Sequence, residues 1–136
     1  MTRIVAPALL GIALCAMLSG CDAGKTRREV RAAGLGNAVH GKQLIEAYGC
    51  GACHLIPGVH AARGMVGPPL EYFAERTMVA GELPNTPENL TLWIEHPRHV
   101  EPGTAMPELG VTQDEANDIA AYLYTLRGPK GTSWID

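Results

Sequence analysis

The sequence predicts a small all-α fold, and three observations support this expectation. Its 136 residues are enough for one domain. Apolar residues recur at helical spacing in three segments, at residues 41–49, 86–96 and 112–127. The segments between them are rich in proline and glycine, which is typical of loops. We therefore expect a few short helices joined by long loops.

The first predicted helix covers residues 41–49, where Leu44, Ile45 and Tyr48 share one face. Gly41 is either a simple helix-start glycine or a small residue at which another helix crosses closely. The helix leads directly into a cysteine motif.

That motif is Cys50-Gly51-Ala52-Cys53-His54, the C-x-x-C-H pattern of c-type haem attachment. Two thiols at this spacing can bond to one porphyrin edge, and the adjacent imidazole can then ligate the iron. A structural zinc site would need further cysteine or histidine ligands at suitable spacing. A thiol–disulfide pair would be expected in a βαβ context. Neither setting is found in the sequence, so the motif favours haem.

After the motif, the sequence predicts a loop, a short helix over residues 69–76 and a second loop over residues 80–85. The next helix begins with Thr86 as its N-cap and Pro87 as its first residue, and it ends at Pro97. Its apolar face consists of Leu90, Trp93 and Ile94.

Residues 97–110 form another predicted loop, and the last helix follows it. Thr112-Gln113-Asp114-Glu115 is a capping box, with Val111 and Ala116 placed as a hydrophobic staple. Gly128-Pro129 is expected to end the helix. The buried stripe is Ile119, Ala120, Leu123 and Leu126.

Two further motifs lie in the loops: Gly-Pro-Pro-Leu at residues 67–70 and Pro-Gly-Thr-Ala-Met-Pro at residues 102–107. Together with the cysteine motif and the capped last helix, they resemble the class I cytochromes c over residues 40–128. The resemblance implies a small all-α class I cytochrome c fold, with the N- and C-terminal helices crossed around one covalently bound haem c. It also implies that Tyr122 packs near Gly41 at this crossing.

The same resemblance implies the roles of individual site residues. Cys50 and Cys53 would carry the haem, and His54 would ligate the iron while donating its Nδ1–H to the carbonyl of Pro68. Met106 would be the sixth ligand, and His/Met ligation raises the reduction potential. Trp93 would lie against the haem near Met106, or it is simply a core tryptophan. Pro68 has the simpler alternative of an ordinary turn.

Other side chains could in principle replace Met106 as the sixth ligand. Met65 and Met78 lack the proline-rich setting that holds Met106. His96 and His99 lie close to Met106 in the sequence, so bis-histidine ligation is the alternative. The loop motif favours Met106.

Residues 1–20 predict an export signal, with Arg3 in its positive region and an apolar run after it. Leu18-Ser19-Gly20-Cys21 resembles the lipobox of bacterial lipoproteins, which implies cleavage before Cys21 and lipidation of its sulfur. Cys15 would leave with the signal. An ordinary secretory peptide or an uncleaved anchor is the alternative.

Residues 21–39 have few large apolar side chains and are interpreted as a flexible, lipid-anchored tether. The cytochrome c domain would then cover residues 40–136. From His40 onward, six Lys and Arg residues stand against twelve Asp and Glu residues, which gives the domain a charge of about −6. This balance gives no indication of nucleic-acid binding, and it predicts docking to a basic or apolar patch on a partner.

These observations predict a one-electron carrier rather than an enzyme, because two axial ligands leave the iron no open position. The resemblance implies a cytochrome bc complex or a dehydrogenase as donor and a terminal oxidase or reductase as acceptor. The protein would be a free carrier or a permanent subunit, anchored at the periplasmic face of the inner membrane. The alternatives are a haem sensor or peroxidase-like enzyme with a labile sixth ligand, and a thiol redox protein.

Overall fold

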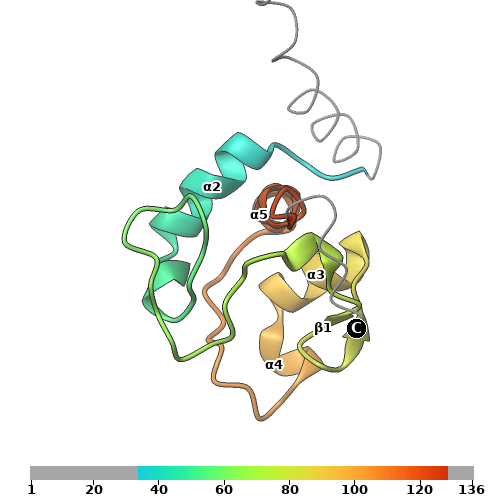
Figure 1. Cartoon of the computed structure of the whole chain (residues 1–136). Helices are drawn as coiled ribbons and strands as arrows, with labels where there is room; N and C mark the ends of the chain where they lie inside the picture. Colours follow the sequence, from blue (N-terminus) through green and yellow to red (C-terminus); the bar gives the residue numbers. More distant parts are fainter. Residues whose placement is uncertain (1–33, 129–136) are drawn as a thin grey trace, which may run out of the picture.

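The computed structural model describes residues 34–128, and within this range it is helical with very little strand. The predicted all-α fold is confirmed. Helix α2 spans Ala38–Ala47, α3 Pro87–Glu95, α4 Pro97–Val100 and α5 Gln113–Leu123; the 3₁₀ turns are η2 (Cys50–Ala52) and η3 (Phe73–Glu75), and the strands are β1 (Met78–Val79) and β2 (Leu83–Pro84). Long loops join these elements (Figure 1).

Helix α2 begins three residues earlier than predicted, because Asn37 caps it. The Asn37 side chain accepts hydrogen bonds from the backbone N–H groups of Val39 and His40. Leu35, just before the cap, is buried in the core. The packed part of the chain therefore includes residues 35–39, which the sequence assigned to the tether. The signal at residues 1–20 and Cys21 lie outside the described residues.

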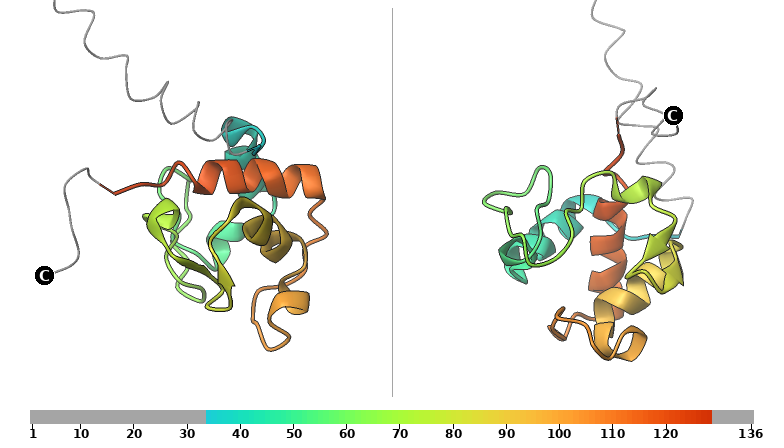
Figure 2. Two further views of the ribbon diagram at one scale, coloured as in Figure 1. Left: turned by 90° about the vertical axis from the view of Figure 1, so that its right-hand side faces the viewer. Right: turned by 60° about the horizontal axis from the view of Figure 1, so that its bottom comes forward.

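Helices α2 and α5 cross, as Figures 1 and 2 show. The contact is made at Gly41, where an added Cβ would lie 1.8 Å from the carbonyl oxygen of Asp118 and 2.9 Å from the backbone nitrogen of Ile119. Only glycine permits so close an approach of two backbones. Gly41 is therefore the crossing residue of the two options that the sequence left open.

Tyr122, expected to pack near Gly41, lies one turn beyond Asp118 on α5 and contacts the loop after the cysteine motif. Its hydroxyl donates to the Pro57 carbonyl oxygen at 2.6 Å, and it lies beside Gly58. The Tyr122 hydrogen bond thus connects α5 to the loop that follows the cysteine motif.

The segment from residue 69 to residue 85 differs from its prediction. Of the expected helix over residues 69–76, only the η3 turn forms. The expected loop over residues 80–85 includes β2, which pairs with β1 in an antiparallel hairpin with Val79 opposite Leu83. Ala80 and Gly81 at the tip both have positive φ, 56° and 79°. Two successive positive φ values are the geometry of a tight hairpin turn, and an Ala-Gly pair is a weak sequence signal for it.

Pro97 was expected to be followed by loop, and instead it begins α4. Proline lacks an N–H group but has a φ suited to the first helical position, so it can end one helix and start the next. His96 is both the C-cap of α3 and the N-cap of α4. The loop that carries Met106 therefore starts at Glu101.

The predicted capping box of α5 is present in full, with Thr112 and Glu115 bonded reciprocally. The helix ends at Leu123, however, and not near Gly128. The hydroxyl of Thr125 donates to the Tyr122 carbonyl oxygen at 2.6 Å. Such a local side-chain bond competes with the helical pattern. Within residues 34–128, no helix is long and apolar enough to cross a membrane.

Candidate functional site

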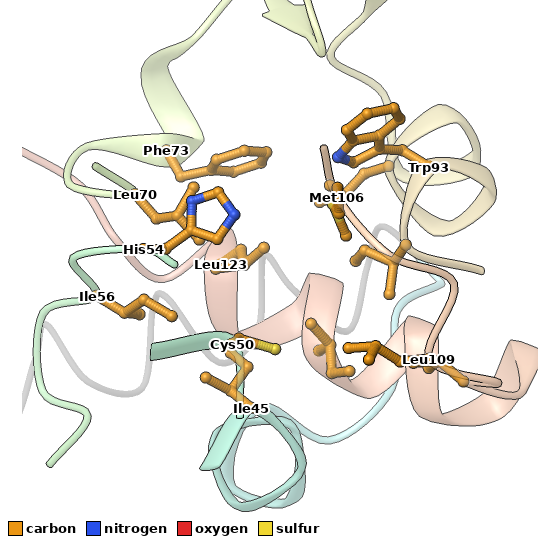
Figure 3. Close-up of a pocket in the computed structure, with 14 residues that line it drawn as sticks. Ile45, Cys50, His54, Ile56, Leu70, Phe73, Trp93, Met106, Leu109 and Leu123 are labelled. Atoms are coloured by element: carbon orange, nitrogen blue, oxygen red, sulfur yellow. The ribbon is translucent and has the colours of Figure 1, made fainter. Parts of the chain in front are cut away.

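A cavity of about 580 Å³, its open mouth included, lies between the helices and the two long loops. Figure 3 shows side chains from both ends of the chain converging on it. The wall is apolar apart from three potential ligand side chains, and its residues are Ile45, Cys50, His54, Ile56, Leu70, Phe73, Leu90, Trp93, Ile94, Met106, Leu109, Val111, Ile119 and Leu123.

Cys50 begins the η2 turn, which follows α2, and Cys53 is the C-cap of that turn. Gly49 has a φ of 70° and reverses the chain at the end of the helix. Both thiols are free and partly buried. Cys50 lines the cavity, whereas Cys53 is not among the lining residues. Burial raises the pKa of the Cys50 thiol, so the protonated form is favoured in the folded chain.

His54 is held in a fixed orientation by the Gly-Pro-Pro-Leu motif at residues 67–70. Its Nδ1 donates to the Pro68 carbonyl oxygen at 2.7 Å, the hydrogen bond that the sequence led us to expect. A Cβ added at Gly67 would lie 2.2 Å from Cε1 of the His54 ring. The absence of a side chain at Gly67 therefore leaves room for the ring, and the Pro68 carbonyl holds the ring in that position. With Nδ1 engaged, Nε2 is the nitrogen left for a metal.

Met106 and Trp93 lie beside each other across the cavity from His54 (Figure 3). The Met106 backbone N–H donates to the Thr104 hydroxyl at 3.1 Å, and the Gly103 N–H donates to the Glu101 carboxylate at 2.9 Å. These two hydrogen bonds stabilise the conformation of the loop that carries Met106. Trp93 is thus a cavity residue, beyond its simpler interpretation as a core tryptophan.

The competing ligands lie elsewhere. Met65 is 93% exposed and Met78 42% exposed, and neither lines the cavity. His96 and His99 are exposed and do not line it either. Among the residues that line the cavity, His54, Met106 and Cys50 carry the only nitrogen or sulfur donors suited to a soft metal.

This set of residues fits a haem c. A c-type haem needs a C-x-x-C-H turn, one imidazole, a second soft ligand on the opposite side and apolar walls for the porphyrin. The cavity supplies an imidazole and a thioether on opposing sides, with a thiol at its edge. Within the described part of the chain, no group of three or more His, Cys, Asp or Glu side chains could hold a separate metal ion.

The motifs did not reveal the whole wall of the cavity. Ile56, Phe73 and Leu109 line it from loops or a single turn, where apolar residues follow no periodicity. Phe73 is the only phenylalanine in the chain. Its size and rarity were the one sequence feature that could have marked it as a cavity residue. Arg76 packs over its ring, with the guanidinium carbon 5.3 Å from the ring centre.

Comparisons with known proteins identify the family to which the chain belongs. The cytochrome c family model matches residues 38–127. Two curated relatives are named cytochrome c oxidase subunit 2. The one from Alkalihalophilus pseudofirmus is 34% identical over 91 residues, which cover 66% of this chain and 26% of the relative.

The second, from Bacillus subtilis, is 31% identical over 96 residues, which again cover 66% of this chain and 26% of the relative. The chain thus spans about a quarter of the length of the curated relatives it matches. No solved structure gives a significant match.

Proposed function

Because this chain belongs to the cytochrome c family, we propose that it is a mono-haem, class I carrier of single electrons with His54 and Met106 as axial ligands. The observation that carries this proposal is the convergence of His54 and Met106 from distant loops onto opposite sides of one apolar cavity. The haem, when bound, supplies an iron that alternates between two oxidation states.

Each of the predicted site residues would have a defined role in holding the haem. Cys50 and Cys53 would form thioethers with its edge, and His54 would ligate through Nε2 because Nδ1 is bonded to Pro68. Met106 would ligate through its sulfur, a soft donor that favours the reduced metal. The apolar wall excludes water, and it lowers the local dielectric around the group.

The rigidity of the site supports a carrier function. The His54 ring is locked by Gly67 and Pro68, and the Met106 loop is closed by its own hydrogen bonds. A site that keeps its geometry in both oxidation states needs little reorganisation at each transfer. With His54 and Met106 both bound to the iron, the site would offer no place for a substrate.

A terminal oxidase is the acceptor that the relatives favour. Both are named as a subunit of cytochrome c oxidase. Because the match covers only the quarter of each relative that corresponds to this domain, we propose an oxidase-linked role at the level of the domain. The chain would deliver electrons to an oxidase as a separate carrier or as a subunit, with a cytochrome bc complex or a dehydrogenase as donor.

The membrane location is proposed from the sequence alone. The lipobox-like Leu18-Ser19-Gly20-Cys21 would place two or more acyl chains on Cys21, and two lipid signals suffice for stable anchoring. The domain would then work at the periplasmic face of the inner membrane.

The decisive experiment is the visible spectrum of the purified protein, oxidised, reduced and reduced under CO. We expect sharp c-type bands on reduction, a far-red sulfur-to-iron(III) band on oxidation and no change with CO. Met106→Ala should lose the far-red band and bind CO, whereas the matched control Met65→Ala should behave as wild type. A prompt CO shift in the wild type would contradict the carrier and favour a gas sensor or peroxidase-like enzyme.

A further inference from the structure

The side chain of Asn85 is bonded at every polar position that it has. Its amide nitrogen donates to the Phe73 carbonyl oxygen at 3.1 Å and to the Arg76 carbonyl oxygen at 2.9 Å. Its amide oxygen accepts from the Tyr124 hydroxyl at 2.8 Å. A carboxamide has two N–H donors and one oxygen acceptor, and here all of them are used.

These bonds connect three parts of the cavity wall. Phe73, on η3, lines the cavity directly. Asn85 itself stands directly before Thr86, the N-cap of α3, whose Leu90, Trp93 and Ile94 line the cavity from another side. Tyr124 is the C-cap of α5, which contributes Ile119 and Leu123. Asn85 therefore lies where three wall elements meet.

The partners of Asn85 are themselves tied together. The Tyr124 and Phe73 rings pack edge to face, with centroids 6.1 Å apart and planes at 75°, a favourable aromatic geometry. The Asn85 backbone N–H donates to the Thr77 carbonyl oxygen at 2.9 Å, which closes the base of the β1–β2 hairpin. Burial raises the pKa of Tyr124 to about 12, so its hydroxyl stays a donor throughout the physiological range.

We propose that Asn85 and Tyr124 form a clamp that positions the wall of the haem cavity and thereby holds Met106 in place. The inference rests on the proposed function, since it concerns the ligation of that same cavity. Asn85 acts through Phe73 and α3 and touches no ligand itself. If the clamp is lost, η3 and α3 separate more easily, and the side of the cavity that carries Trp93 and Met106 opens more often.

Imidazole binding measures this opening directly, because an added ligand reaches the oxidised iron only when Met106 has left it. Its apparent affinity scales with the population of the open state. Asn85→Ala removes three side-chain hydrogen bonds and Tyr124→Phe removes one of these. We expect Asn85→Ala to bind imidazole about tenfold more tightly, and Tyr124→Phe about threefold more tightly, than the wild type.

The matched control is Asn89→Ala. Asn89 is the next asparagine along the chain, and its amide donates only to the Pro84 carbonyl oxygen, at 2.9 Å. We expect its imidazole affinity and far-red band to equal those of the wild type. The double variant Asn85→Ala/Tyr124→Phe should show less than the sum of the two single effects, because both substitutions remove members of one network.

A merely structural role would give a different result. If Asn85→Ala lowers the thermal midpoint but leaves imidazole affinity and reduction potential unchanged, the clamp does not act on Met106 and the proposal is wrong. If Asn85→Ala fails to fold, Tyr124→Phe decides the matter, since it removes one hydroxyl and keeps the ring. A wild type that lacks the far-red band would instead refute the proposed His54/Met106 ligation, and this is established before any variant is made.

Discussion

The absence of a side chain at Gly67 determines where the His54 ring can lie. The His54 ring occupies the space that a Cβ at residue 67 would need, and the neighbouring Pro68 carbonyl takes its Nδ1 proton. Both constraints come from one turn. The His54 orientation therefore depends on backbone at positions 67 and 68, more than on any side chain.

Gly67→Ala should therefore disturb the site as well as the fold. A Cβ 2.2 Å from the ring forces His54 to rotate, which breaks its bond to Pro68. Overpacking of this kind costs about 1–3 kcal/mol. We expect a lower free energy of unfolding and an altered spectrum of the reduced protein. Denaturant titration and visible spectroscopy measure the two effects.

Gly128→Ala is the control for this substitution, because Gly128 does not line the cavity and an added Cβ would first meet the end of the Glu75 side chain at 3.1 Å. It should leave the spectrum unchanged. An unaltered spectrum in Gly67→Ala would show that the His54 orientation does not depend on this contact.

At this scale, the sequence drew attention to three candidate ligands that do line the cavity, but it did not reveal most of the cavity wall. Cys50, His54 and Met106 stand in motifs whose spacing reflects their chemistry, so position in the chain was enough to select them. Phe73 and Ile56 stand in irregular segments, and no periodicity tells which way such a side chain points. Asn85 was missed for the same reason, since its partners are 9 to 39 residues away in the chain.

Among the elements, α5 depends on a charged cap. The Glu115 carboxylate accepts from the Thr112 N–H at 2.9 Å, from the Thr112 hydroxyl at 2.7 Å and from the Tyr48 hydroxyl at 2.9 Å. The bonds to Thr112, and then the bond to Tyr48, lower the pKa of Glu115 below its ordinary value of 4.5. Through Tyr48, the same carboxylate also joins α5 to the end of α2.

This arrangement predicts the direction of a pH effect. Because the pKa of Glu115 is lower in the folded state, its contribution to stability is present above the unfolded pKa of about 4.5 and is lost as the pH falls through the folded pKa. Glu115→Gln should thus be less stable than wild type at pH 7, and the difference should shrink in acid. Denaturant titrations at pH 7 and pH 3 measure this.

Glu82→Gln is the control, because Glu82 is exposed in the hairpin and its side chain makes no hydrogen bond within residues 34–128. Its stability difference from wild type should be small at both pH values. A difference for Glu115→Gln that stays constant with pH would mean that the carboxylate is not what stabilises the helix.

The starts of α3 and α5 were predicted well from their threonine caps, whereas the start of α2 at the Asn37 cap, the end of α5, the hairpin and α4 were not. Thr86 and Thr112 cap their helices as expected. The hairpin escaped prediction because its strands are two residues each, too short for an alternating pattern. Helix α4 escaped because proline was interpreted only as a helix end, although it also suits a helix start.

At the scale of the whole molecule, elements from the beginning and the end of the described residues line one cavity. The crossing places α2, the helix that leads into the cysteine motif, against α5, the last helix of the described residues (Figure 2). Because Gly41 lets the two backbones meet, η2 and the Met106 loop reach the same cavity. The family match over residues 38–127 covers the same unit.

The proposed lipid anchor is the last feature to test, and it concerns how the domain would be held at a membrane. Lipidation of Cys21 predicts that the protein sediments with membranes and that its N-terminal peptide carries a diacylglyceryl mass on Cys21. Cys21→Ser should lose that mass. Cys15→Ser is the matched control, since Cys15 lies within the predicted signal and its substitution should change neither the mass nor the membrane fraction. If unmodified Cys21 is recovered behind an intact leader, the segment is an uncleaved anchor, and the domain is then held by a helix in place of acyl chains.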